Sequence, residues 1–154
     1  MRHQYRLGID PGINGAVVIL CDDQPIEWMR MPTITIGKSK RVDAAGLREF
    51  LRNYAIDHAF VELVHAMPGQ GVTSMFSFGH ACGAVEGLLS ALHIPVTLVT
   101  PQAWKKRAGL IGSDKDAARS RARQLWPRWS ELGSKGAGQA YADAGLIALF
   151  GDLA

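Results

Sequence analysis

The chain has 154 residues, of which 47% are hydrophobic, 20% charged and 8% aromatic, and its formal net charge is +3. This length is typical of one globular domain with a substantial core, and the charge is only a weak indication of a polyanionic partner. The two cysteines, Cys21 and Cys82, exclude a disulfide scaffold and a C-x-x-C metal site, and the chain shows neither a long apolar run nor a signal-peptide pattern. We therefore expect a cytoplasmic protein without a membrane span.

The first part of the chain predicts three short strands, a loop and a helix. Strands are expected at residues 5–9, 16–21 and 26–31, because these runs are apolar or alternating and are separated by turn residues such as Gly12 and Gly15. Residues 32–41 show no apolar period and are expected to form a mobile loop. After Asp43, which suits an N-cap, apolar residues recur at helical spacing up to Tyr54.

The second part alternates strands with helices. Residues 59–64 and 95–99 read as buried strands, and residues 73–92 as a helix that follows the loop 65–71. Pro101 begins a short helix, and Ser113 or Asp114 caps a basic helix that ends near residue 126. A loop at 133–138 precedes the last helix at 139–150. This order predicts an α/β fold with a mixed sheet flanked by helices, forming a single domain over residues 1–154.

Three acidic residues occupy positions that are otherwise apolar. Asp10 ends a strand, Glu62 lies inside one, and Asp143 lies beside the apolar stripe of the last helix. Any one of them alone is explained by an ion pair or a turn cap, since a buried carboxylate requires a partner. Three acids that converge at one end of a sheet would instead form an all-oxygen site for Mg²⁺ or Mn²⁺, with a pair of ions activating water for phosphodiester hydrolysis.

The motifs of the chain, taken in order, resemble a known family. The segments LGIDPGINGA, VELVHAMPGQGVTSMFSFG, VTPQAWKKRAGL and SDKDAARSRARQLWP are similar to those of the RuvC family of Holliday junction resolvases, in particular its phage and prophage members. The resemblance runs from residue 7 to about residue 151. It implies an RNase H-like fold, a homodimer, four-way DNA junctions as partners, and nicking of DNA in recombination or repair with two Mg²⁺ (or Mn²⁺) ions per active site.

The resemblance also assigns the site. Asp10 corresponds to the first catalytic acid and metal ligand, Glu62 to the second and Asp143 to the last. The family places another acid three or four residues before the last one, where this chain has Ala140 or Gln139. Gln139 stacks one helical turn from Asp143, so its neutral amide oxygen is a candidate metal ligand.

Three functions stay open at this point. The first is a structure-selective, metal-dependent endonuclease that nicks four-way and other branched DNA. The second is a junction-binding protein with weak or no nuclease activity, because the third acid is replaced. The third, an actin-like ATPase or sugar kinase, also uses an Asp-x-Gly-x-x-Gly turn but requires a second, duplicated domain.

Basic residues concentrate in the segment 105–135, which holds nine basic and three acidic residues, a local charge of +6 that leaves −3 for the rest of the chain. The distribution indicates a nucleic-acid surface, although a solvated helix face would show the same composition. The resemblance places Lys105, Lys106 and Lys115 near the scissile phosphate, with Lys115 in a catalytic role. Lys115, Arg119 and Arg123 recur every four residues and predict one stripe of a helix that follows the phosphates.

The expected helix at 73–92 carries two further features. Phe76 is expected to be exposed and to contact DNA, whereas Phe78 is expected in the core; the alternative is that both are core residues. Gly79, Gly83 and Gly87 recur every four residues. Because glycine weakens a helix, this spacing predicts close contact with another helix, either within the chain or in a second subunit.

Overall fold

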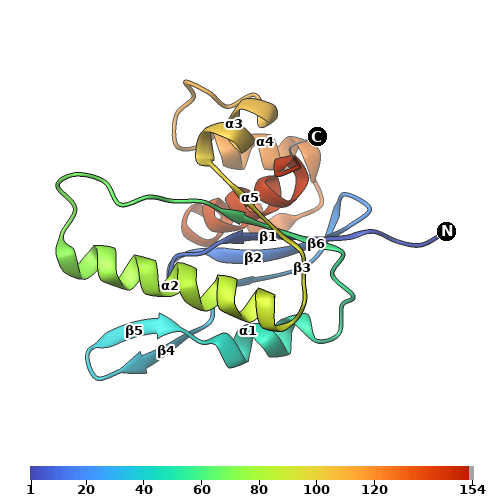
Figure 1. Ribbon diagram of the computed structural model, residues 1–154. Helices are drawn as coiled ribbons and strands as arrows, with labels where there is room; N and C mark the ends of the chain where they lie inside the picture. Colours follow the sequence, from blue (N-terminus) through green and yellow to red (C-terminus); the bar gives the residue numbers. More distant parts are fainter. Residues whose placement is uncertain (153–154) are drawn as a thin grey trace.

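A five-stranded mixed sheet forms the centre of the structure, a computed structural model that describes residues 1–152 (Figure 1). The strand order is β3 (Gln24–Arg30), β2 (Ala16–Cys21), β1 (Tyr5–Asp10), β6 (His58–Glu62) and β7 (Val96–Val99). The pairs β1–β2 and β2–β3 are antiparallel, and β1–β6 and β6–β7 are parallel. The predicted mixed sheet is thus confirmed; the last two positions of the expected domain, 153 and 154, lie outside the described residues.

Helices cover both faces of this sheet, as Figure 1 shows. On one side lie α1 (Ala44–Leu51) and α2 (Val72–Ala91), and on the other α3 (Pro101–Ala108), α4 (Ala117–Leu125) and α5 (Lys135–Phe150). The strands alternate between two cores: Val17 and Ile19 pack with the α1–α2 side, while Val18 and Leu20 pack with the α5 side. Within residues 1–152, none of the helices combines the length and the apolar character of a membrane span.

Close packing of α5 on β1 depends on a glycine. A methyl group at Gly8 would overlap the carbonyl oxygen of Ala144 and would lie 2.8 Å from the Cβ of Ala148. The helix presents alanine at both positions, and both are fully buried. The backbone of α5 therefore rests directly on the central strand, with almost no side-chain thickness between them.

The expected mobile loop at residues 32–41 is wrong. These residues form a two-stranded antiparallel hairpin of β4 (Thr33–Ile36) and β5 (Ser39–Val42), with Gly37 at its tip in a left-handed conformation, φ +62°. The run Thr-Ile-Thr-Ile has strong strand propensity and the glycine supplies the turn. The apolar pattern is weak because β4 is exposed along its whole length.

Several boundaries also differ from the prediction, three of them near the expected functional residues. Strand β6 ends at Glu62 instead of continuing to residue 64, and α4 begins at Ala117, after Lys115. Helix α5 begins at Lys135, inside the expected loop 133–138 and just after a 3-10 turn, Ser130–Gly133. The glycines of this segment suggested a loop, but Gly138 serves packing: a methyl group there would lie 2.6 Å from the carbonyl oxygen of Leu132.

We expect Gly8→Ala to lower the free energy of unfolding by about 1–3 kcal/mol, because the added methyl group must push α5 away from β1. Chemical denaturation measures the change. Gly136→Ala, on the exposed first turn of α5, is the control: nothing lies within 4 Å of its new methyl group, so it should be neutral or slightly stabilising. A Gly8→Ala protein as stable as the parent would contradict the packing described here.

Candidate active site

The structure brings the three predicted acids to one edge of the sheet. Asp10 and Glu62 are the last residues of β1 and β6, which run parallel with Ile9 opposite Val61, so both carboxylates leave the sheet at neighbouring positions. Asp143 reaches the same edge from α5, because that helix packs on β1. The carboxyl ends of parallel strands are a common place for a functional site.

The electrostatics of the three acids show that they interact. Burial raises the pKa of each carboxyl group above its ordinary value. The negative charge of Asp10 further raises the pKa of Glu62, and the charges of Asp10 and Glu62 together with burial raise the pKa of Asp143 to about 7. Like charges at short range disfavour ionisation, so the trio is under strain that a cation would relieve.

A buried tryptophan fixes Glu62. The indole Nε1 of Trp104, on α3, donates a hydrogen bond of 2.8 Å to Glu62 Oε1, and this bond lowers the pKa that burial raises. Trp104 is 1% exposed. Sequence reasoning missed this contact, although a buried indole N–H usually has an acceptor and the tryptophan precedes the two predicted lysines.

A second residue that the sequence reasoning missed supports Asp10. Arg30, the last residue of β3, donates hydrogen bonds to the carbonyl oxygens of Asn14 (2.9 Å) and Gly15 (3.3 Å) and so holds the turn that follows β1. Its positive charge and a hydrogen bond from the backbone of Gly12 both lower the pKa of Asp10. No local pattern signals the contact, because Arg30 reaches the turn across β2.

Gln139, and not Ala140, is the residue that stands beside Asp143. Its side-chain Nε2 donates a hydrogen bond of 3.0 Å to Asp143 Oδ1. Ala140 is buried in the core between α5 and its neighbours. Gln139 therefore orients Asp143 and partly offsets its burial, since this bond lowers the pKa of the carboxyl group.

A cavity of about 300 Å³ opens next to Asp143. Two of the predicted lysines, Lys105 and Lys115, line it together with Asp114, Gln139 and Asp143. Lys105 lines the same cavity as Asp143, and its charge lowers the pKa of both Glu62 and Asp143. The structure thus unites the acids with cations, the combination that a phosphate substrate requires.

The predicted stripe of basic residues on α4 is partly wrong. Lys115 precedes the helix, so it does not share a helical face with the other two. Arg119 is only 15% exposed; it lies 3.5 Å from Asp116 and donates to the carbonyl oxygen of Gly133. Arg123 and Lys106 are exposed to solvent.

Helix α2 shows two exposed features on the other side of the sheet. Phe76 is 68% exposed, whereas Phe78 is half-buried and packs near Gly12. Gly79, Gly83 and Gly87 face open space, with no described atom within 4 Å of a methyl group built there. An internal helix partner for these glycines, one of the two predicted alternatives, is therefore wrong for residues 1–152.

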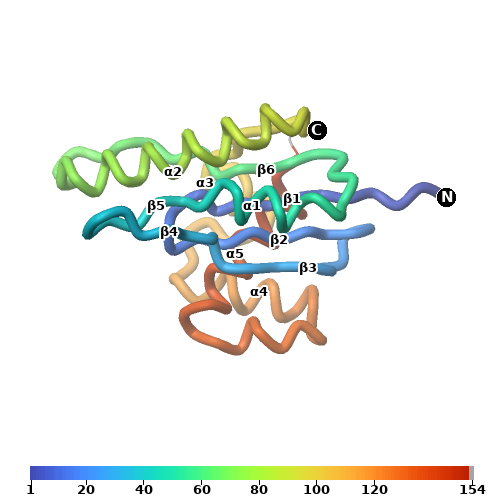
Figure 2. The backbone as a smooth tube through the Cα atoms, turned by 90° about the horizontal axis from the view of Figure 1, so that it is seen from below, coloured from blue at the N-terminus to red at the C-terminus, as the bar shows by residue number. Residues whose placement is uncertain are grey.

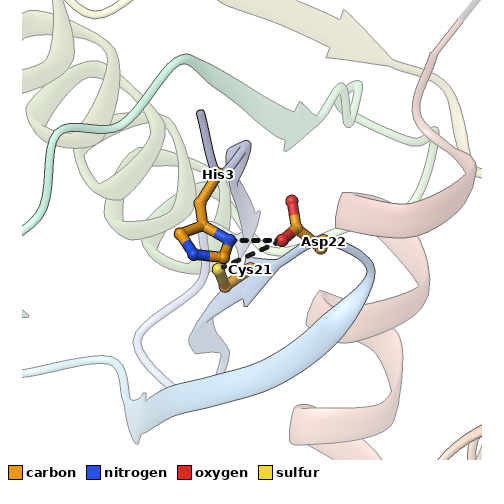
Figure 3. Close-up of side chains that lie close together, drawn as sticks. All are labelled: His3, Cys21 and Asp22. Carbon is orange, nitrogen blue, oxygen red and sulfur yellow. Dashed lines mark hydrogen bonds and ion pairs between the residues drawn. The ribbon is translucent and has the colours of Figure 1, made fainter. Parts of the chain in front are cut away.

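The site offers carboxylate oxygens, which fit Mg²⁺ or Mn²⁺ better than zinc. Within the described range, the one group of three potential ligands whose atoms all lie within 4.8 Å of one another is His3, Cys21 and Asp22 (Figure 3).

The His3 group belongs to the opposite end of β1, where Tyr5 faces Cys21, whereas Asp10 faces Ala16. His3 Nδ1 lies 2.6 Å from Asp22 Oδ2, and the backbone N–H of Gln4 donates to Asp22 Oδ1 at 2.9 Å. These contacts tie the segment before β1 to the turn after β2. They account for the cluster without a metal ion and place it apart from the candidate active site.

Comparison with known proteins supports the fold. No protein-family model matches the sequence, and no match was found among curated proteins. Among solved structures, the chain is similar to T. thermophilus RuvC in complex with Holliday junction substrate, with a TM-score of 0.64, 21% identity, and coverage of 96% of this chain and 92% of that chain. A second Thermus thermophilus RuvC structure gives a TM-score of 0.55, 20% identity, and coverage of 94% of this chain and 90% of that chain. The arrangement of sheet and helices is thus RNase H-like, as expected.

We expect Asp143→Asn to stabilise the metal-free protein at pH 8. The unfolded chain ionises Asp143 near pH 4 and the folded chain only near pH 7. Stability is therefore lost as the pH rises through that window, by on the order of 2–4 kcal/mol. Thermal unfolding in chelator at pH 4 and pH 8 should show a gain for the variant only at pH 8.

Asp116→Asn, at an exposed acid, is the control and should not reproduce this gain. Equal stability of Asp143→Asn and the parent at pH 8 would contradict the buried position of Asp143 beside the other two acids.

Proposed function

We propose that this protein is a RuvC-like endodeoxyribonuclease of the phage type, structure-selective and dependent on a divalent metal, which nicks four-way (Holliday) junctions and other branched DNA. Residues 1–154 would act as one resolvase domain. The observation that carries the proposal is the convergence of Asp10, Glu62 and Asp143 beside a lysine-lined cavity, on an RNase H-like sheet.

Asp10, Glu62 and Asp143 would hold two Mg²⁺ or Mn²⁺ ions. Asp10 is suited to be shared between both ions, because its charge acts on both of the other carboxylates. When bound, such a pair lowers the pKa of an attacking water and neutralises the leaving oxygen. Trp104 and Gln139 keep one oxygen each of Glu62 and Asp143 fixed, so the ligands are oriented before the substrate arrives.

The lysines around the cavity would act on the DNA. Lys115 and Lys105 line the space next to Asp143, where an ammonium group stabilises the charge that develops on a phosphate. The exposed Lys106 and Arg123 would contact neighbouring phosphates. Arg119 would join them only by leaving Asp116 and Gly133.

One observation favours a second function, a junction-binding protein with little nuclease activity. Gln139 carries no charge where the family has an acid, and its N–H, rather than its oxygen, faces Asp143. The site would then hold its metal ions weakly, since a neutral ligand binds Mg²⁺ less strongly than a carboxylate.

A labelled four-way junction, with Mg²⁺ or Mn²⁺ and with binding and nicking measured in parallel, tests both functions. We expect the parent protein to nick the junction symmetrically and Asp10→Asn to lower the nicking rate by about 10² or more while still binding. Glu49→Gln, at an exposed acid of α1, should behave as the parent. Nicking that persists unchanged in Asp10→Asn would refute the proposed active site.

Gln139→Asp separates the two functions in the same assay. A parent protein that binds the junction without nicking it, together with nicking by Gln139→Asp, would establish the binding function. Nicking by the parent would show that three acids with Gln139 suffice.

We also propose that the protein is a homodimer in which the glycine face of α2 contacts the second subunit. A two-fold protein matches the two-fold symmetry of a four-way junction, and the exposed glycines allow close approach of another helix. We expect Gly83→Leu to convert a dimer to a monomer in sedimentation measurements. Gln124→Leu, at an exposed position of α4, is the control and should stay dimeric; a Gly83→Leu dimer would contradict this interface.

A further inference from the structure

The β4–β5 hairpin forms a basic surface that the sequence analysis did not connect with function. It carries Lys38, Lys40 and Arg41, and it lies beside the N-terminal half of α2 in both views of the chain (Figures 1 and 2). Among the described residues, none of the three cations forms an ion pair. By contrast, Arg48 and Arg52 on α1 both lie near Glu49.

The segments around the hairpin lack acids. Residues 11–21, 31–42 and 63–85 contain no aspartate or glutamate at all. These segments supply the turn after β1, the hairpin, and the loop and first turns of α2. The positive charge of the hairpin is therefore not neutralised locally, and it faces solvent at the end of the molecule where β1 terminates.

A small cavity lies between the hairpin, α2 and the turn that follows β1. It measures about 180 Å³ and is lined by Ile13, Lys40, Arg41, Phe76 and His80 among others. Ile13 belongs to the turn that directly follows Asp10, so the cavity begins three residues from a predicted metal ligand. Phe76, 68% exposed, adds an apolar ring at the same place.

We propose that the β4–β5 hairpin is a second DNA-binding surface, in which Lys38, Lys40 and Arg41 bind the phosphate backbone of one arm of a branched DNA whose scissile phosphate lies at the carboxylate site. The inference rests on the proposed function. Phosphodiester DNA is the occupant that fits, because the surface offers unpaired cations with an exposed aromatic ring and lies at the end of the sheet where Asp10 and the proposed phosphate site are found.

The position of the hairpin gives it a role distinct from that of α3 and α4. Those helices lie on one side of the sheet and the hairpin and α2 on the other, with the carboxyl ends of β1 and β6 between them (Figure 1). DNA arms that diverge from the scissile phosphate would meet one basic surface each. Contacts with phosphates carry no sequence information, so the hairpin would select the shape of the substrate.

The salt dependence of binding tests this inference. Affinity of the full-length protein for a labelled four-way junction is measured between 50 and 200 mM salt, in Ca²⁺ or chelator to prevent nicking. Three phosphate contacts contribute about 2.7 to the slope of log affinity against log salt. We expect the triple variant Lys38→Gln, Lys40→Gln, Arg41→Gln to reduce the slope by two to three units. Its loss of affinity relative to the parent should therefore be about 40-fold greater at 50 mM salt than at 200 mM salt.

The control removes the same charge elsewhere. Arg2→Gln, Arg48→Gln, Arg52→Gln takes three positive charges from exposed positions away from the hairpin and should change the slope by less than one unit. Equal slopes for the two triple variants would overturn the hairpin surface. If the parent protein does not prefer the junction over a linear duplex, the proposed function itself fails, which is a different result.

Folding is checked by thermal unfolding of both variants. If the hairpin triple variant does not fold, the single variants Lys38→Gln and Lys40→Gln replace it, since both side chains are exposed. Each should lower the slope by about 0.9. Single variants with the slope of the parent would overturn the inference as well.

Discussion

The direct contact between α5 and β1 is the constraint on which the candidate site depends. Gly8 has no side chain, and Ala144 and Ala148 have small ones, so the helix backbone lies against the central strand. Asp143 precedes Ala144 and is thereby brought over the end of β1, where Asp10 leaves the sheet. A larger residue at any of these three positions would thicken the interface and carry Asp143 away from Asp10 and Glu62. The packing of these small residues therefore does more than stabilise the fold, because it also brings the three acids of the candidate site together.

The close packing of α5 on β1, which brings the three acids together, also lowers the stability of the folded state. Three carboxylates share a half-buried edge; burial raises the pKa of each, and the charges of the neighbouring acids raise the pKa of Glu62 and Asp143 further. Trp104, Gln139, Arg30 and Lys105 offset part of this cost by a hydrogen bond or a positive charge. A purely structural network would remove the repulsion by pairing each acid with its own cation. The incomplete compensation observed here is typical of a site that awaits a cation or a substrate.

Sequence reasoning correctly predicted the features that depend on local residue patterns. The order of the five sheet strands along the chain, the extent of α2 and the acids at 10, 62 and 143 follow from periodicity and from charge in apolar runs. The hairpin at residues 33–42 was missed because β4 is exposed along its whole length and Val42 is the one buried residue of β5, so there is no buried stripe. The supporting contacts of Trp104 with Glu62, 42 residues apart, and of Arg30 with the turn after β1 depend on the tertiary fold. Glycine at 138 suggested a loop, although it serves close packing within a helix.

The distribution of charge along the sequence and its distribution on the folded surface identify different basic regions. The count places the excess of basic residues in the segment 105–135 and makes the rest of the chain net negative. In the structure the acids of that remainder lie mostly away from the hairpin: Glu27, Glu49 and Asp57 are engaged by Tyr54, Arg52 and Arg2. The three cations of residues 38–41 are thus left free at the active-site end of the sheet. A branched DNA presents several negatively charged arms to one cleavage site, and cations on both sides of the sheet edge match that geometry better than a single basic helix does.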